Sequence, residues 1–185
     1  ERPSVLVVPG TKDALPFGPF DPARHRTLEQ ALRKWVGEQT GFDLGYTEQL
    51  YTFGDRGRHL PSGRKMGGRV VSVGYLALSR QAGGAGTAWR GWYHYFPWED
   101  WRGAKPAMID AIILPALRKF VKAAPDTQMA ELRRERVRLC FGEGGGRWDE
   151  EKGLERYELL YEAALVAEFA RDTGARPGSV TLGAV

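Results

Sequence analysis

The sequence predicts a mixed α/β fold in which a strand and a helix come first, a group of strands follows, and helices close the chain. Three observations support this order. A short apolar run at residues 4–8 stops at Pro9-Gly10, as a buried strand does. Apolar residues then recur at helical spacing after Thr27, and a run rich in Val, Tyr and Leu occupies 69–79. Strands and helices in this order indicate an α+β or α/β sandwich.

The first helix is expected between Thr27 and Gly41. Thr27 is an N-cap residue, and Gln30 three positions later completes a capping box. Gly41 is a stop signal after the last helical position. The apolar positions recur on one face, namely Leu28, Ala31, Leu32, Trp35 and Val36. The preceding residues 12–25 are rich in Pro and Gly and are expected to form a loop.

Three further strands are expected at 46–53, 69–79 and 88–95, the last two joined by a glycine-rich turn at 83–86. Residues 87–101 hold seven aromatic side chains. Strand alternation over 88–95 would place Trp89, Tyr93 and Tyr95 on one face. A core or interface role is favoured for these rings over stacking on a base.

The C-terminal half predicts three helices. The first covers 109–121, with Pro115 inside it as a kink or break. The second is expected over 126–138 and the third over 149–170, with a glycine loop at 142–146 between them.

Composition excludes several classes of protein. A 42% apolar fraction and six Trp suffice for the packed core of one domain of 185 residues, which excludes global disorder. No apolar run approaches the roughly 18 residues that span a bilayer, and no signal-type start is present, so a cytoplasmic protein without membrane contact is expected. The single cysteine, Cys140, excludes an internal disulfide framework. The net charge of +4 is compatible with anionic ligands.

Familiar catalytic motifs are missing. His25, His59 and His94 stand apart, with no nucleophile elbow and no zinc-type His pair. Cys140 follows an apolar helix face, which favours a small core residue over a nucleophile. The loop 142–146 lacks the Lys-Ser/Thr ending of a phosphate-binding loop. The four arginines between 133 and 138 alternate with Glu, which favours a solvated face over a nucleic-acid contact.

A basic loop follows the strand at 46–53. Between residues 56 and 69 it carries no acidic residue and five basic ones, Arg56, Arg58, Arg64, Lys65 and Arg69. Guanidinium groups match phosphate oxygens, so this loop could receive phosphates. An exposed loop with incidental charge is an equal alternative.

Three stretches together resemble the Nudix family. Residues 14–21, Ala-Leu-Pro-Phe-Gly-Pro-Phe-Asp, look like the approach to a Nudix helix, and Gln39-Thr40-Gly41-Phe42 is similar to the close of a Nudix box. Residues 48–55 and 69–78 resemble the strand pair of Nudix domains that act on ADP-ribose-type compounds. The resemblance covers about 1–165 and implies a Nudix-like α/β/α sandwich with a mixed sheet and extra C-terminal helices.

The Nudix box itself departs from the pattern. Alignment on Gly41-Phe42 places Arg26, Trp35 and Gln39 at three positions where the pattern has Glu. Those carboxylates hold Mg²⁺ in the family, and one unit charge at about 4 Å is worth about 4 kcal/mol at an effective dielectric of ~20. Losing even one therefore removes several orders of magnitude in rate. The box is interpreted as inactive, with no catalytic residue, no resident metal and no cofactor.

A Nudix-like domain without its metal box is similar to the sensor halves of bacterial repressors of NAD metabolism, in particular the NadQ type of alphaproteobacteria. Residues 14–21, 51–58 and 155–163 resemble recurrent phrases of that family. The resemblance implies an NAD-related nucleotide effector such as ADP-ribose, a homodimer, and DNA binding through a winged helix beyond Val185, with 166–185 as linker. The abrupt chain end, and the start at Glu1, are expected of part of a longer protein.

The loop charge and the resemblance together predict the binding residues. Phosphates are assigned to Arg56, Arg58 and Arg69, with Lys65 assisting, and base stacking to Tyr51, Phe53 or Tyr75. Glu38 and Gln39 would contact ribose or phosphate in place of a metal. Two alternatives stay open. One is a Mg²⁺-dependent Nudix hydrolase with relocated ligands, drawn from Glu29, Glu38, Asp43 and Glu48. The other is a scaffold that dimerises through its aromatic strand and C-terminal helices.

Overall fold

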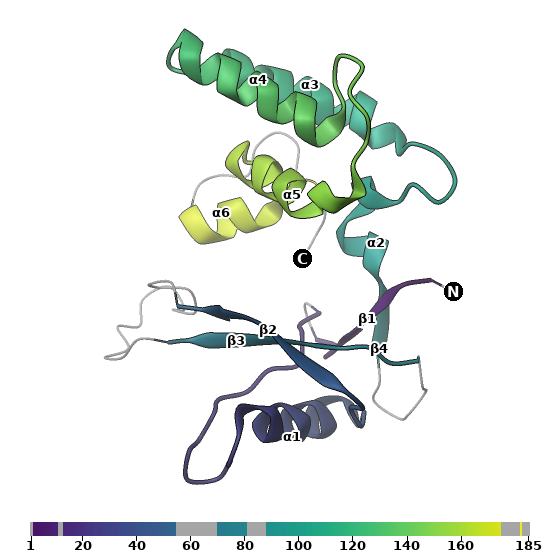
Figure 1. Ribbon diagram of the computed structural model, residues 1–185, viewed down its shortest axis with the longest axis vertical. Coiled ribbons are helices and arrows are strands. Elements are labelled where there is room, and N and C mark those ends of the chain that lie inside the picture. The colour runs from purple at the N-terminus through teal and green to yellow at the C-terminus, as the bar shows by residue number, and fades with distance from the viewer. Residues whose placement is uncertain (1, 11–12, 55–69, 81–87, 175–181, 183–185) are drawn as a thin grey trace. The chain divides into compact units, whose positions relative to one another are not determined.

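The computed structural model describes residues 2–10, 13–54, 70–80, 88–174 and 182, and these form two compact units. One unit is Leu6–Trp89, and the other combines Glu1–Val5 with Arg90–Val185. Six α-helices and two two-stranded sheets are found in the described part of the chain (Figure 1). The predicted mixed α/β class is thereby confirmed.

Strands and one helix build the first unit. β2 (Thr47–Phe53) and β3 (Ser72–Ala77) form an antiparallel hairpin in which Thr47 lies opposite Ala77 and Phe53 opposite Ser72. The register shifts between Gln49 and Tyr51, so Leu50 is the extra residue of a β-bulge. β1 (Ser4–Val7) pairs with β4 (Ala88–Gly91), and the division between the two units falls within these two strands.

Helix α1 (Leu28–Thr40) begins and ends where the sequence predicts. The Thr27 hydroxyl accepts a hydrogen bond from the backbone N–H of Gln30 at 3.1 Å, and the Gln30 side chain accepts one from the N–H of Arg26 at 2.9 Å. Gly41 ends the helix at φ 67°, a conformation that disfavours residues with a Cβ atom. The helix buries Ala31, Val36 and Thr40.

The second unit is helical. It contains α2 (Trp92–Tyr95), α3 (Leu114–Lys122), α4 (Thr127–Phe141), α5 (Gly153–Glu162) and α6 (Ala167–Thr173). Short 3₁₀ turns occur at Pro97–Glu99 and Glu150–Lys152, and a π-helical turn at Ile109–Ile113 precedes α3. Neighbouring helices α3 and α4, α4 and α5, and α5 and α6 pack in sequence (Figure 1). The core contains fully buried side chains from the turn Pro97–Glu99, the π-helical turn, α3, α4 and α5, including Trp98, Ile109, Ile113, Leu117, Val137, Leu159 and Leu160.

Pro115 coincides with a change of helix type and not with a gap in the helix. The π-helical turn Ile109–Ile113 runs directly into α3, and Pro115 lies in the first turn of α3, two residues after the π-helical turn ends.

Two predicted elements are wrong in part. The strand expected over 88–95 ends at Gly91, and residues 92–95 are helical, so the alternation of aromatic rings does not hold. The N–H of Trp92 donates to the carbonyl of Pro3 at 2.9 Å, and Pro3 has no N–H to return, which ends the ladder.

The helix expected over 149–170 is interrupted between Glu162 and Ala167. Ala164 takes φ 57°, and the buried pair Leu165 and Val166 adopts an extended course instead. There the N–H of Leu182 donates to the carbonyl of Leu165 at 2.6 Å. Extended pairing with a distant residue therefore replaces helical hydrogen bonds at this point.

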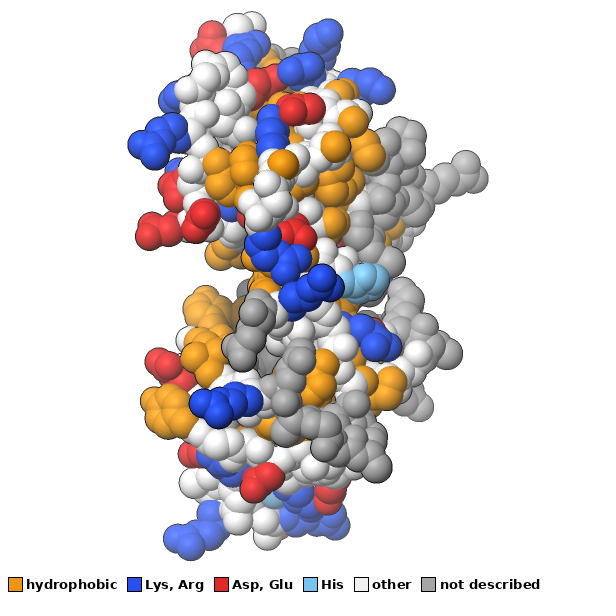
Figure 2. Space-filling view, turned by 90° about the vertical axis from the view of Figure 1, so that its right-hand side faces the viewer, with side chains coloured by type: hydrophobic (Ala, Val, Ile, Leu, Met, Phe, Trp, Pro, Cys, Tyr) orange, Lys and Arg blue, Asp and Glu red, His pale blue; other side chains and the backbone are white. Residues whose placement is uncertain are grey.

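Cys140 is a small core residue, as predicted, and two of the four arginines between 133 and 138 form ion pairs with glutamates. Cys140 is 4% exposed and belongs to the core, and burial raises the pKa of its thiol. On α4, Arg136 pairs with Glu162 and Arg138 with Glu135. Basic and acidic side chains are interspersed over the helical unit on the face that Figure 2 shows. Of the helices in the described ranges, none has the length and apolar content needed to cross a membrane.

Candidate functional site

Five of the nine predicted binding residues fall within the described residues, all in the first unit. Tyr51 and Phe53 lie on β2, Tyr75 on β3, and Glu38 and Gln39 on α1. The four basic residues assigned to phosphates, Arg56, Arg58, Lys65 and Arg69, lie outside the described residues.

The hairpin divides the three aromatic rings between its two faces. Tyr51 is paired with Gly74, and Phe53 lies two residues further on the same face, with the two ring centroids 4.8 Å apart. Tyr75 follows Gly74 and therefore faces the other way, where its hydroxyl lies 3.4 Å from Oε1 of Gln49. Tyr51 is 63% exposed. The hairpin thus brings the exposed ring of Tyr51 next to the half-buried ring of Phe53 on one face, and Tyr75 is not part of this pair.

On α1, Gln39 clamps the segment before the helix. Its Oε1 accepts from the backbone N–H of Phe17 at 3.2 Å, and its Nε2 donates to the carbonyl of Phe17 at 2.5 Å. Both ends of the amide are therefore used by the backbone. The side chain of Glu38 makes no hydrogen bond to the backbone of the described residues. Its Oε1 lies 3.9 Å from Nζ of Lys34 on an exposed face.

Trp35 holds the same segment. Its Nε1 donates to the carbonyl of Pro19 at 3.1 Å, and a Cβ atom built on Gly18 would lie 2.2 Å from the indole ring. Only glycine fits beneath this ring. Two of the positions that hold metal carboxylates in the Nudix pattern are thus occupied by side chains that pack and hydrogen-bond against 17–19.

His25, to which no role was assigned from the sequence, packs beside the same segment. The ring lies near Phe20 and Trp35, with centroid distances of 6.0 and 6.1 Å, and it is 5% exposed. Nδ1 accepts from the backbone N–H of Asp21 at 3.1 Å, which assigns the proton to Nε2. Nε2 is buried without a partner among the described residues.

The four carboxylates considered as relocated metal ligands are not grouped. Glu29 is engaged by Arg33 at 2.8 Å and by the hydroxyl of Thr47 at 3.0 Å, and these hydrogen bonds, that from Arg33 first, lower the pKa of its carboxyl. No three His, Cys, Asp or Glu side chains in the described ranges are placed to hold a metal ion. Trp35, Gln39 and Arg26, which the resemblance aligns with carboxylates of the Nudix pattern, carry no carboxylate and therefore offer Mg²⁺ no charged oxygen.

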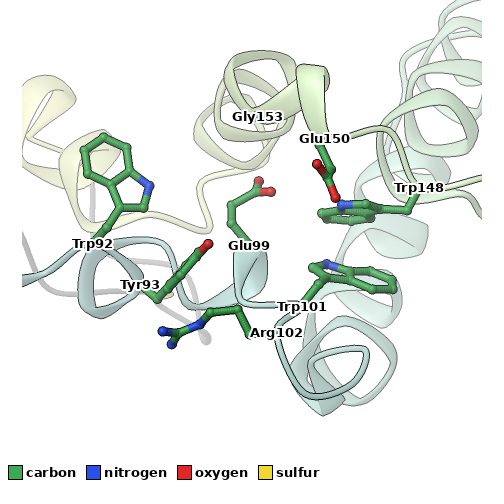
Figure 3. Close-up of a pocket in the computed structure, with 8 residues that line it drawn as sticks. All are labelled: Trp92, Tyr93, Glu99, Trp101, Arg102, Trp148, Glu150 and Gly153. Atoms are coloured by element: carbon green, nitrogen blue, oxygen red, sulfur yellow. The ribbon is translucent and has the colours of Figure 1, made fainter. Parts of the chain in front are cut away.

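A pocket in the helical unit was not anticipated from the sequence (Figure 3). It has a volume of about 400 Å³ and is lined by Trp92, Tyr93, Glu99, Trp101, Arg102, Trp148, Glu150 and Gly153. Trp92 and Tyr93 lie on one side, Trp101 and Trp148 on the other, and Glu99 between them. The aromatic stretch 87–101 supplies three of the four rings; the fourth, Trp148, arrives from beyond α4.

One buried guanidinium positions both Glu99 and Trp148. Arg156 is 0% exposed and donates from Nε and Nη2 to the two carboxylate oxygens of Glu99 at 2.7 and 2.8 Å. Its Nη1 donates to the carbonyls of Asp149 at 2.7 Å and Cys140 at 3.3 Å. The guanidinium carbon lies 3.8 Å from the centroid of the Trp148 ring. Trp148 in turn stacks on Trp101, with centroids 4.4 Å apart.

Arg102 at the pocket's edge is likewise paired. Its Nε and Nη2 each lie 2.7 Å from an oxygen of Asp100, and these hydrogen bonds lower the pKa of the Asp100 carboxyl. The same guanidinium lies 4.5 Å from the Tyr93 ring centroid. Glu150 is exposed, and no ion pair of its carboxylate is found among the described residues.

Neither the protein-family models nor the curated proteins with which the sequence was compared contain a match.

Proposed function

We propose that this chain is a nucleotide-sensing domain that binds an NAD-related ligand, such as ADP-ribose or a dinucleotide, and does not hydrolyse it. The proposal depends on one observation. Trp35 and Gln39 pack and hydrogen-bond against Phe17, Gly18 and Pro19. The finer fold proposed with it is a Nudix-like α/β/α sandwich with a mixed sheet and extra C-terminal helices.

Loss of hydrolysis follows from the chemistry of the box. A divalent cation needs several charged oxygens, and an indole and an amide supply none. The amide of Gln39 is moreover held in one orientation by two hydrogen bonds to the backbone of Phe17, which leave one N–H and one lone pair for a ligand. The other α1 side chain assigned to ribose or phosphate, Glu38, lies on an exposed face.

Binding of a nucleotide is supported by the exposed ring of Tyr51 and the half-buried ring of Phe53 beside it. These rings stand at the end of β2, and the sequence from 56 to 69, which begins three residues after Phe53, carries five basic residues and no acid. An aromatic ring stacks on any base, and base stacking is worth about 1–3 kcal/mol per base. A stacking surface followed by guanidinium groups is the combination that a base joined to phosphates requires.

The biological setting rests on the resemblance to regulators of NAD metabolism. In this proposal the domain acts in the cytoplasm as a homodimer, residues 166–185 lead toward a winged-helix domain, and DNA is bound by that further domain.

Calorimetric titration of ADP-ribose and NAD into the chain, with Mg²⁺ present, tests the proposal. We expect a saturating heat with a fixed stoichiometry, and we expect chromatography to detect no released nucleoside monophosphate. Replacing Arg56 and Arg58 together with Ala should weaken binding at least tenfold, and Tyr51→Ala should weaken it by a similar factor. Tyr46→Ala is the matched control, since Tyr46 is also exposed, at 79%, and lies before β2.

Other outcomes separate the alternatives. Sustained heat with product formation would establish a Mg²⁺-dependent hydrolase and refute the sensor. Absence of heat, together with no thermal stabilisation by either nucleotide, would favour a scaffold.

A further inference from the structure

We infer that the aromatic pocket of the helical unit is a binding site for a flat organic cation, separate from the proposed nucleotide site. The inference does not depend on nucleotide binding, because every residue that carries it lies between Trp92 and Arg156, in one compact unit.

The shape of the pocket favours a ring. Its volume of about 400 Å³ lies within the range of small-ligand sites, and its walls are four aromatic side chains, Trp92, Tyr93, Trp101 and Trp148 (Figure 3). Trp92 is 45% exposed, which leaves an entry from solvent. A planar ligand can lie along such walls with little loss of side-chain freedom, because the stacked pair of Trp101 and Trp148 is already ordered by Arg156.

The charges around the pocket favour a cation. Arg156 is neutralised by Glu99 and Arg102 by Asp100, each through two hydrogen bonds. The carboxylate of Glu150 adds one negative charge without an ion pair in the described part of the chain. The lining itself thus carries two carboxylates, Glu99 and Glu150, and one guanidinium, Arg102. Guanidinium groups already lie over Trp148 and Tyr93, so the exposed ring of Trp92 is the electron-rich face that remains for a ligand cation.

Other ligand classes fit less well. A phosphate would face Glu150 and would need Arg102 to leave Asp100, which costs a charge-assisted pair. A neutral hydrocarbon would fill the space, but it would displace water from the outer lone pairs of Glu99 and would make no polar interaction with that carboxylate. A cation that is flat and weakly hydrated satisfies both the rings and the carboxylates.

A pair of probes matched in size isolates the charge. N-Methylquinolinium is a flat cation, and 4-methylquinoline has the same number of non-hydrogen atoms but is neutral under mildly alkaline conditions. Calorimetric titration of each into the chain, without nucleotide, should give one site for the cation and at least tenfold weaker binding of the neutral probe. Trp92→Ala should weaken binding of both probes, since it removes a wall.

A charge variant then assigns the site. Glu150→Gln should weaken binding of the cation several-fold and leave binding of the neutral probe unchanged. Glu151→Gln is the matched control, because this exposed neighbour does not line the pocket. Both positions are exposed, so folding is retained, which circular dichroism checks. Equal affinity for the two probes, no binding of the cation, or an equal effect of the two Glu variants would each overturn the inference. None of these results bears on whether ADP-ribose binds.

Discussion

Removing Arg156 should destabilise the helical unit far more than removing Arg136, although each arginine makes a two-point ion pair with a glutamate. Arg156 binds Glu99 through distances of 2.7 and 2.8 Å with its side chain 0% exposed. Arg136 binds Glu162 through distances of 2.5 and 2.9 Å with its side chain 38% exposed. The substitutions Arg156→Met and Arg136→Met therefore compare the same chemistry at two depths.

The expected magnitude follows from what each change leaves behind. Without Arg156, the carboxylate of Glu99 loses its counter-charge at 17% exposure, and the carbonyls of Asp149 and Cys140 lose a donor. Breaking one partner of a buried ion pair costs about 3–5 kcal/mol in free energy of unfolding. Without Arg136, Glu162 stays in water, and the loss is about 0–1 kcal/mol.

Urea unfolding followed by far-ultraviolet circular dichroism measures both losses, because the helices of this unit dominate the signal. The double variant Arg156→Met with Glu99→Leu should recover a large part of the loss, since it removes the orphaned carboxylate as well. Equal destabilisation by Arg156→Met and Arg136→Met would refute the reasoning, and so would a double variant that is less stable than Arg156→Met alone.

Three further predictions concern other parts of the chain. Gly18→Ala should destabilise the first unit by about 1–3 kcal/mol in thermal melts, because its Cβ would lie 2.2 Å from the Trp35 ring. Gly37→Ala, with open space around it in α1, should be neutral or stabilising in the same melts. A larger loss of stability with Gly37→Ala than with Gly18→Ala would contradict this packing. Burial raises the pKa of Tyr157 to about 12 from an ordinary 10.0, so the stability contributed by its neutral phenol is present below pH 10.0 and is lost as the pH rises through about 12. In urea titrations at alkaline pH, Tyr157→Phe should reduce this loss of stability, and an unchanged dependence on pH would contradict the prediction. Cys140, buried and with a raised thiol pKa, should react slowly with a thiol reagent in the native chain and rapidly in denaturant, whereas fast native labelling would show an open core.

Local signals in the sequence predicted local structure well. The ends of α1 are decided by Thr27, Gln30 and Gly41, all within one turn of the residues they cap, so the prediction was confirmed at both ends. The order of strands and helices, and the irregular helical turn just before Pro115, depended on equally short-range rules.

The errors arose where distant residues decide the outcome. The strand at 88–95 ends early because its partner begins beside Pro3, and the helix at 149–170 breaks because residues 165 and 166 pair with Leu182. No periodicity in either segment reports those partners.

The aromatic pocket escaped prediction for the same reason. Glu99 and Arg156 are 57 positions apart, and Trp148 lies 47 positions after Trp101. Sequence inspection could single out the ring-rich stretch at 87–101, but only the fold brings Trp148 and Arg156 to it. In contrast, Tyr51 and Phe53 share a strand face by simple alternation.

The separation of Glu99 and Arg156 in the sequence also means that Glu99 leaves the ribosome before its ion-pair partner is synthesised. At about 5–20 residues per second, the 57 positions between them take about 3–11 s to synthesise. During that interval Trp92, Trp98 and Trp101 have been made, while the helix that carries their organising guanidinium has not. The nascent chain therefore presents a cluster of indoles before it can bury them. Slowing translation between residues 102 and 148 should lengthen this exposure and raise the yield of aggregated chain, even though the finished protein is unchanged.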